Sequence, residues 1–247
     1  MGALFNEILY RPLLNALVFL YNTIAFKDMG VAIIMLTVGV RVALAPFFHK
    51  SMKHQTVLQR LQPAIKKIQH DHKDNREKQA QALMELYREH QVNPFAGILL
   101  IFLQLPILIA LYQVFRDIHA IPPEALYSFI TFPSVVQPLF LHLINLQERS
   151  IILIGLAALA QYIQGRISLS GKRGEKAEGF ARQMVFMGPA LTILFFWSFP
   201  AALGLYWCAT SIFSLGQQFM IQRALRRTDN ATDHGPNTIS EQRRKTD

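Results

Sequence analysis

The sequence predicts an all-α membrane protein with five transmembrane helices, an N-terminal interfacial helix and a cytoplasmic helical hairpin. Of its 247 residues, 51% are hydrophobic and only 17% are charged, whereas roughly 25% are charged in an average soluble domain. Five apolar runs each approach the ~20 residues that a helix needs to cross a hydrocarbon core. The Lys and Arg residues, which bring the formal net charge to +9, are concentrated in particular segments between these runs.

The apolar runs define the predicted spans. Only α-helices satisfy every backbone amide within one open segment in lipid, so each run is predicted to be a helix. Prolines within or beside the runs are tolerable where neighbouring helices pack against them. The runs cover residues 29–48, 95–116, 150–167, 184–200 and 202–221.

The positions of Lys and Arg predict the orientation. Residues 49–93 carry nine of them, 168–183 carry four and the tail from 222 carries six, whereas 117–149 carries only Arg149. Basic segments stay in the cytoplasm. The N-terminus is therefore predicted outside and the C-terminus inside, which is the parity that an odd number of spans requires.

The first 27 residues are apolar but contain Glu7, Arg11 and Pro12. We expect these residues to interrupt the length that a spanning helix needs. No basic region precedes the apolar run, which argues against a signal peptide. Residues 1–27 are predicted to form an amphipathic helix in the extracytoplasmic interface, with an additional span as the alternative.

Residues 28–225 are predicted to form the five-span core, which includes a soluble hairpin at 50–92. Apolar residues recur there at spacings of three and four on either side of a polar turn at 70–75, as expected for two amphipathic helices. Residues 226–247 are polar and basic without apolar periodicity, so this tail is predicted to be disordered. Its arginines are suited to anionic lipid or to RNA phosphates.

Arg41 is the most informative residue because it lies inside the first predicted span. A charge at that depth costs at least ~2.5–3.5 kcal/mol on insertion scales, so we expect it to face a watery or protein-lined cavity. All 16 Asp and Glu residues and all eight His residues lie outside the predicted spans. Arg41 is thus predicted to lack a carboxylate partner at its own depth. The alternative to a cavity is that its side chain snorkels to the cytoplasmic surface.

Uncharged polar residues occur in the other predicted spans. Together with Arg41 they suggest a hydrophilic groove, although each one alone is also typical of hydrogen bonds between helices. They are Gln104, Gln161, Gln164, Thr192, Thr210, Ser211, Ser214, Gln217 and Gln218.

Catalysis and metal binding are not indicated. An intramembrane enzyme needs a nucleophile with a base, or metal ligands, and the predicted spans contain no His, Asp or Glu. His70, Asp71, His72 and Asp74 lie in the polar turn of the hairpin, where solvated side chains are expected rather than a metal site. No cofactor is predicted.

Several motifs resemble, in order, those of the YidC membrane protein insertase family over about residues 3–225. They are GVRVALAPF at 39–47, LQPAI at 61–65, VNPFAG at 92–97, QLPILIALY at 104–112 and FPAALGLYW at 199–207. The resemblance implies a groove that opens to the cytoplasm and the lipid and contains Arg41. It also implies that Gln104, Tyr206, Trp207 and either Gln161 or Gln164 contact clients there, and Thr210 is predicted to line the same groove.

The implied function is a non-enzymatic insertase and chaperone in the bacterial cell (inner or plasma) membrane. Its implied partners are nascent membrane protein clients and lipid, with the ribosome and the Sec translocon as further candidates and no small-molecule substrate. Clients or partners are expected to be recruited at the hairpin near Lys66, Lys67, Lys73 and Arg76. The alternative is a secondary transporter for an anionic solute, although such transporters usually contain intramembrane acidic groups and repeated halves.

Overall fold

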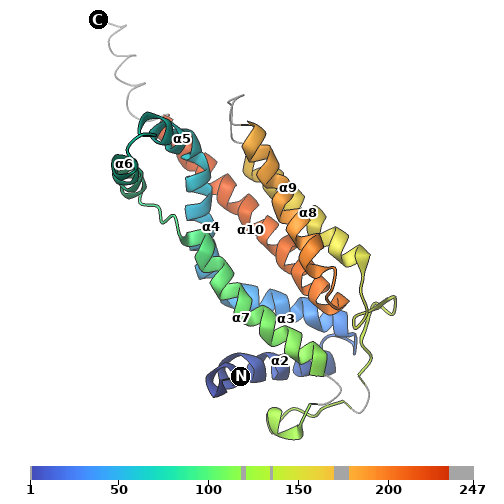
Figure 1. Ribbon diagram of the computed structural model, residues 1–247. Helices are drawn as coiled ribbons and strands as arrows, with labels where there is room; N and C mark the ends of the chain where they lie inside the picture. The colour runs from blue at the N-terminus through green and yellow to red at the C-terminus, as the bar shows by residue number, and fades with distance from the viewer. Residues whose placement is uncertain (1, 118–120, 134–135, 170–177, 234–247) are drawn as a thin grey trace, which may run out of the picture.

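The computed structural model describes residues 2–117, 121–133, 136–169 and 178–233. It confirms the all-α class: helices dominate the described residues, and the two strands are two residues long each. In Figure 1, helices α7 to α10 run along the long axis of the molecule, α2 lies across its lower end, and α5 and α6 project at the upper end.

The described residues form a series of helices, with one pair of short strands in the long connection before the last three helices. The elements are α1 (Ala3–Phe5), a π-helical turn (Asn6–Tyr10), α2 (Arg11–Thr23), α3 (Met29–Ala43), α4 (Ala45–Arg60), α5 (Gln62–Asp71), α6 (Arg76–Glu89), α7 (Ala96–Asp117), a 3₁₀ turn (Pro123–Ala125), β1 (Leu139–Phe140), β2 (Ile144–Asn145), α8 (Ile151–Leu169), α9 (Glu178–Phe196) and α10 (Ala201–Asp233). Strands β1 and β2 pair antiparallel, with Leu139 opposite Asn145.

Helices are present at all five predicted spans, but the number that cross a membrane is not confirmed. By length and composition, and among the described residues, the segment Ala3–Thr23 is apolar enough to cross, and the bent pair α3 and α4 counts as a second if taken as one span. Shorter apolar stretches lie in α7, α8 and α9, at Phe102–Arg116, Ile151–Ile167 and Val185–Phe196. The five-span count therefore stays a prediction.

The first predicted span, 29–48, is not one straight helix. Helix α3 ends at Ala43, and α4 begins at Ala45 with Pro46 in its first turn. The two axes differ in direction by 72°. Proline is favourable in the first turn of a helix because its missing N–H has no partner there anyway, so Pro46 starts a new helix. The expectation of one helix over residues 29–48 was wrong, because the helix that contains Arg41 ends at Ala43.

The N-terminal segment is also different from the expectation, because Glu7, Arg11 and Pro12 do not interrupt it. The chain is helical from Ala3 to Thr23. Glu7 and Arg11 lie one turn apart and pair at 3.3 Å, while Pro12 lies in the first turn of α2. The interfacial placement of this helix stays a prediction.

The hydrophobic core lies at the end of the molecule away from α5 and α6 (Figure 1). Helices α2, α3, α7 and α10 meet there, and the most deeply buried side chains come from all four: Leu14, Leu17, Ile33, Leu111, Val114 and Leu203. Strand β1 packs closely on α3, because any side chain at Gly30 would collide with the ring of Phe140.

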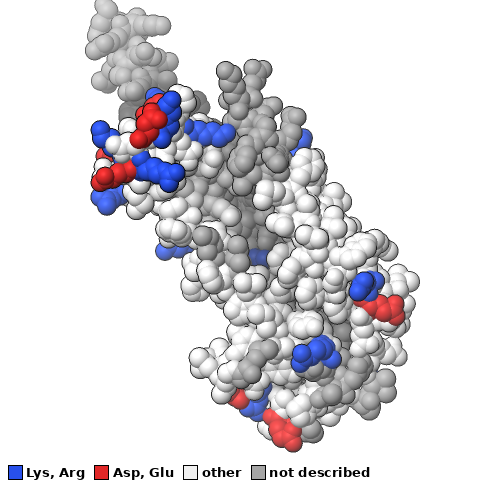
Figure 2. All heavy atoms as spheres, in the orientation of Figure 1, with Lys and Arg blue, Asp and Glu red and all other residues white. Residues whose placement is uncertain are grey.

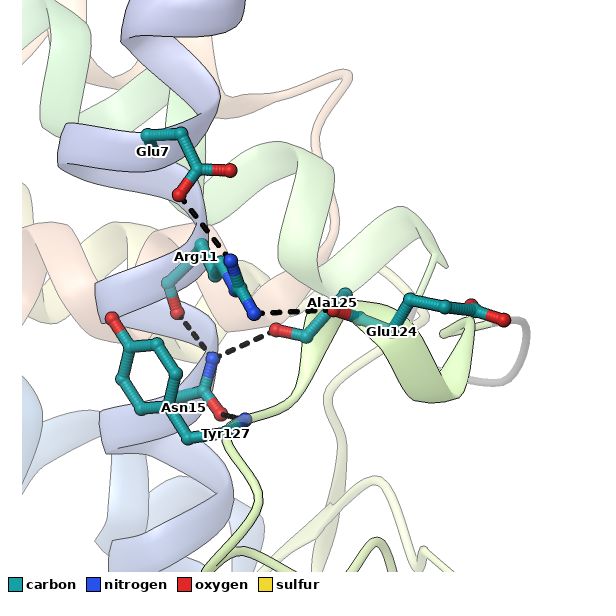
Figure 3. Close-up of polar contacts among 6 residues, drawn as sticks. All are labelled: Glu7, Arg11, Asn15, Glu124, Ala125 and Tyr127. Atoms are coloured by element: carbon teal, nitrogen blue, oxygen red, sulfur yellow. Dashed lines mark hydrogen bonds and ion pairs between the residues drawn. The ribbon is translucent and has the colours of Figure 1, made fainter.

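Asn15 joins α2 to the segment that follows α7 (Figure 3). It is 1% exposed, and its amide nitrogen donates to the carbonyl oxygens of Arg11 at 2.7 Å and Ala125 at 2.9 Å. Its amide oxygen accepts from the backbone N–H of Tyr127 at 2.7 Å. Arg11 adds a contact to the carbonyl of Glu124 at 3.3 Å. A single side chain thus satisfies backbone groups that the end of the bundle buries.

Asp28 anchors the same side of the molecule. One carboxylate oxygen accepts from the backbone N–H of Val31 at 2.9 Å and caps α3, while the other accepts from Leu141 N–H at 2.6 Å. Such a cap satisfies one of the free N–H groups at a helix start. Residues 121–133 and 136–147 are therefore held across the core by α2 and by the start of α3.

The predicted hairpin at 50–92 is formed by three helices rather than two. Helices α4 and α5 form its first arm, which is broken at Leu61, and α6 forms the second after a turn at residues 72–75. Ile65 is buried, but α6 buries no residue. The apolar sides of α5 and α6 therefore bury each other only in part.

The predicted disorder from residue 226 does not begin there, because α10 continues as a helix to Asp233. The prediction ended this helix too early. Once the first part of a helix is formed and packed, further residues can extend it without an apolar face of their own. Residues 234–247 lie outside the described residues.

The substitution Asn15→Ala should lower the free energy of unfolding by about 2–4 kcal/mol, because it leaves buried backbone groups of Ala125 and Tyr127 without partners. Denaturant titration in detergent micelles, followed by circular dichroism, measures this loss. Asn22→Ala is the matched control, since the Asn22 amide makes an exposed hydrogen bond to Thr131 O at 2.7 Å, and it should cost much less. Equal losses in the two variants would contradict the clamping role of Asn15.

Candidate functional site

Arg41 lies in the last turn of α3, beside the bend into α4. Its side chain is 6% exposed, and its guanidinium carbon lies 4.1 Å from the ring centroid of Phe48 on α4. The bend brings the two residues together and forms a cation–π contact. The negative end of the α3 dipole also favours a cation in the last turn. Protein encloses Arg41, and its place in a water-filled groove stays a prediction.

No carboxylate among the described residues lies within 4.0 Å of Arg41; the ion pairs in that part of the chain involve Arg11 and His70. The groups near Arg41 are instead polar and uncharged. Tyr206 on α10 is near enough to interact with it electrostatically, and the amide of Gln104 on α7 donates to the Tyr206 hydroxyl. Arg41, Gln104 and Tyr206, here called the arginine cluster, thus join α3, α7 and α10.

A second set of predicted groove residues lies between α8, α9 and α10. The hydroxyl of Thr192 is 2.8 Å from the amide oxygen of Gln161, and the indole N–H of Trp207 donates to that hydroxyl at 3.3 Å. With the Gln161 amide in the orientation that satisfies all its neighbours, Trp207 N–H also reaches its oxygen at 2.6 Å. Gln161, Thr192 and Trp207 are here called the tryptophan cluster.

The two clusters occupy different sides of α10. Tyr206 and Trp207 are adjacent, and successive residues of an α-helix point about 100° apart. Tyr206 therefore faces α3 and α7, whereas Trp207 faces α8 and α9. The sequence predicts one groove lined by all these residues. The structure instead places them in two separate clusters, one on each side of α10.

The surface is hollowed between two arms of the molecule. One arm consists of α4 and the hairpin, and the other of α8 and α9, with α10 between them (Figure 1). The space-filling view shows a furrow between these arms in the upper half of the molecule (Figure 2). Below the furrow, the hydrophobic core and residues 121–133 and 136–147 fill the space between the helices.

The remaining predicted groove residues lie on the same helices. Thr210 is 5% exposed and follows Tyr206 by four residues, so it faces the same side of α10. Gln164 is half-buried on α8, three residues after Gln161. The sequence analysis missed Phe48, which contacts Arg41, and it placed Thr192 among the polar groove residues without assigning it to the client-binding set. The bend after Arg41, which the sequence did not reveal, places Phe48.

The predicted recruitment residues Lys66, Lys67, Lys73 and Arg76 are all exposed on the hairpin. They do not form a purely basic surface, because residues 62–91 carry six Lys and Arg but five Asp and Glu. Figure 2 shows both signs of charge intermixed at this end of the molecule. Within the described residues, no group of three His, Cys, Asp or Glu side chains is placed to hold a metal ion.

Comparison with known proteins relates this architecture to a family. The family model of the 60Kd inner membrane protein matches residues 19–229. The chain is 32% identical to membrane protein insertase YidC 2 of Bacillus anthracis, over 89% of this chain and 81% of that protein. It is 31% identical to membrane protein insertase YidC of Nitratidesulfovibrio vulgaris (strain DSM 19637 / Miyazaki F), over 88% of this chain but only 38% of that protein.

A solved structure has the same fold. The crystal structure titled as an active YidC insertase with the first transmembrane domain resolved superposes with a TM-score of 0.60 and 26% sequence identity, over 84% of this chain and 45% of that one. The chain thus spans less than half of this structure and of the Nitratidesulfovibrio relative. The match over residues 19–229 and the shared fold show that this bacterial membrane protein belongs to the 60Kd inner membrane protein family, the family of the YidC insertases.

Proposed function

We propose that the protein is a membrane protein insertase and chaperone, which inserts client transmembrane helices through the furrow between its two arms. The insertase names of the relatives support this function. The observation that carries it is a buried cation, Arg41, that no carboxylate among the described residues neutralises. Such a cation can attract an acidic segment that comes and goes.

The barrier to insertion is the transfer of polar groups through hydrocarbon. An unsatisfied polar group in the bilayer core costs several kcal/mol, so a polar furrow that enters part of the membrane shortens the dry path. Arg41 would attract an acidic tail into this furrow, and the low local dielectric strengthens that attraction relative to water. No covalent step is needed, which agrees with a function other than catalysis.

The client's apolar helix would then leave the furrow sideways into lipid. The walls available to it are α8, α9 and α10, whose outward sides carry exposed apolar residues such as Leu159, Leu194 and Ile212. Trp207 is half-buried between these helices. The polar residues would thus guide the client's tail while the apolar surfaces guide its helix.

Topology and partners complete the proposal. The chain would cross the bacterial cell membrane five times, with its N-terminus outside and its basic segments inside. The hairpin would receive clients, the ribosome or the Sec translocon through its exposed charges. Arg223 near the cytoplasmic end would contact anionic lipid. The names of the relatives give no support to the alternative of an anion transporter.

Proteoliposomes that contain Arg41→Ala should insert a single-span client with an acidic external tail about tenfold more slowly than the parent, because one charge interaction of about 1.4 kcal/mol is lost. Arg41→Lys should retain most of the activity, since the role requires a cation. Protease protection of the client's tail measures insertion.

Two controls separate this charge effect from misfolding. Arg166 is an exposed arginine in the last turn of α8, and Arg166→Ala should leave insertion nearly unchanged. A client whose acidic tail residues are replaced by Gln and Asn should be indifferent to Arg41→Ala. If the parent and Arg41→Ala insert the acidic client at equal rates, Arg41 does not have the proposed role.

The Gln104–Tyr206 contact should show an energetic coupling of about 0.6–1.7 kcal/mol, the range of hydrogen bonds between transmembrane helices. Gln104→Leu, Tyr206→Phe and the double variant form the cycle, and the free energy of unfolding in micelles is measured for each. The double variant should lose less stability than the sum of the losses in the two single variants, because each single variant leaves a buried polar group without its partner. Strict additivity would mean that the two side chains do not stabilise each other.

A further inference from the structure

The indole of Trp207 is held by polar groups from two other helices. Its N–H is 3.3 Å from the hydroxyl of Thr192 on α9 and 2.6 Å from the amide oxygen of Gln161 on α8. One ring face packs on Phe196, with the ring centroids 5.0 Å apart. The rest of the ring stays partly exposed. Both the plane and the rotation of the indole are therefore determined by neighbours outside its own helix.

Thr192 is the central member of this cluster. Its side chain is 5% exposed, and its hydroxyl lies between Trp207 and Gln161, where it accepts from the indole and donates to the amide. Gln161 is in turn anchored, since its amide nitrogen donates to the carbonyl oxygen of Gly188 at 2.9 Å. A Cβ at Gly188 would lie only 3.3 Å from the Gln161 amide, so the small residue makes room for this contact.

We propose that Thr192, supported by Gln161, is a positioning residue that holds Trp207 in the orientation in which it contacts the client. The inference rests on the proposed insertase function. Tryptophan has two side-chain torsions, and a hydrogen bond to a buried, anchored partner removes the freedom of both. A fixed indole presents a constant apolar surface to passing helices, whereas a freely rotating indole loses conformational entropy each time a client binds.

The chemistry of Thr192 makes this role separable from packing. Valine has nearly the shape of threonine but no hydroxyl, so Thr192→Val keeps the volume and removes both hydrogen bonds. Serine keeps the hydroxyl and removes one methyl group. A purely packing role predicts that the valine variant is closer to the parent, whereas a positioning role predicts that the serine variant is closer.

The fluorescence of Trp207 reports its orientation directly. The chain has two tryptophans, so Trp197→Phe leaves Trp207 as the only tryptophan of the full-length protein, which is excited selectively at wavelengths that the tyrosines do not absorb. In this background, Thr192→Val should lower the steady-state anisotropy of Trp207 and increase its quenching by acrylamide, and Thr192→Ser should not. Thr37→Val is the matched control: Thr37 is also buried, but its hydroxyl bonds within its own helix, to Ile33 O at 2.6 Å, so it should leave the fluorescence unchanged.

Insertion of the acidic single-span client, measured in the same proteins, links position to function. Thr192→Val should insert about two- to tenfold more slowly, the factor expected for the loss of the one hydrogen bond between Thr192 and the indole, and Thr192→Ser should restore the rate. Gln161→Leu should lower the anisotropy in the same direction and serves as the second variant if Thr192→Val does not fold. Circular dichroism verifies the helix content of each variant.

The possible results distinguish a failure of this inference from a failure of the proposed insertase function. Unchanged anisotropy in both Thr192→Val and Gln161→Leu overturns the inference, and so does altered anisotropy with an unaltered insertion rate. Failure of the unsubstituted protein to insert the client overturns the proposed function, and the client-contact role of Trp207 with it. Loss of order and of rate in Thr192→Val, with recovery of both in Thr192→Ser, supports the inference.

Discussion

A positive charge buried in a membrane protein constrains everything around it. Arg41 cannot face hydrocarbon without a cost of several kcal/mol, and no carboxylate among the described residues balances it. The fold meets this constraint with weaker interactions: the negative end of the α3 dipole, the ring of Phe48 and the polar groups near Tyr206. These interactions enclose the guanidinium without neutralising its charge. In the proposed function, this charge would remain available to an acidic group of a client.

Helix α10 provides the common wall of the molecule. Tyr206 reaches toward α3 and α7, and Trp207 reaches toward α8 and α9, so two adjacent residues connect α10 to the helices on its two sides. At one end, the packed core and the segment held by Asn15 and Asp28 close the space between the helices. At the other end the arms diverge, and the furrow lies between them (Figure 2). A molecule closed at one end and open at the other suits a path that enters the membrane without crossing it.

The comparisons indicate which part of the family this chain represents. Its match covers most of the Bacillus anthracis relative but well under half of the Nitratidesulfovibrio relative, so the helical region is the part that this chain shares with both. Arg41, Gln104, Tyr206 and the tryptophan cluster all lie inside the family match at 19–229. The proposed mechanism accordingly needs only residues of this region, and it uses attraction and shape rather than chemical reaction.

The sequence by itself determined the helical class, the approximate position of the helices and the isolation of Arg41 from acidic residues, because these follow from apolar run length and from the absence of Asp and Glu in those runs. The tertiary structure alone decided the bend at Leu44, which places Phe48 on Arg41, and the division of the polar residues into two clusters on α10. Whether a segment forms a helix depends mainly on its own residues, and the length and spacing of its apolar residues reveal it. The direction in which a helix turns and the side on which a neighbour packs depend on contacts between residues far apart in the chain, such as Gln161 with Trp207, and no local pattern encodes them.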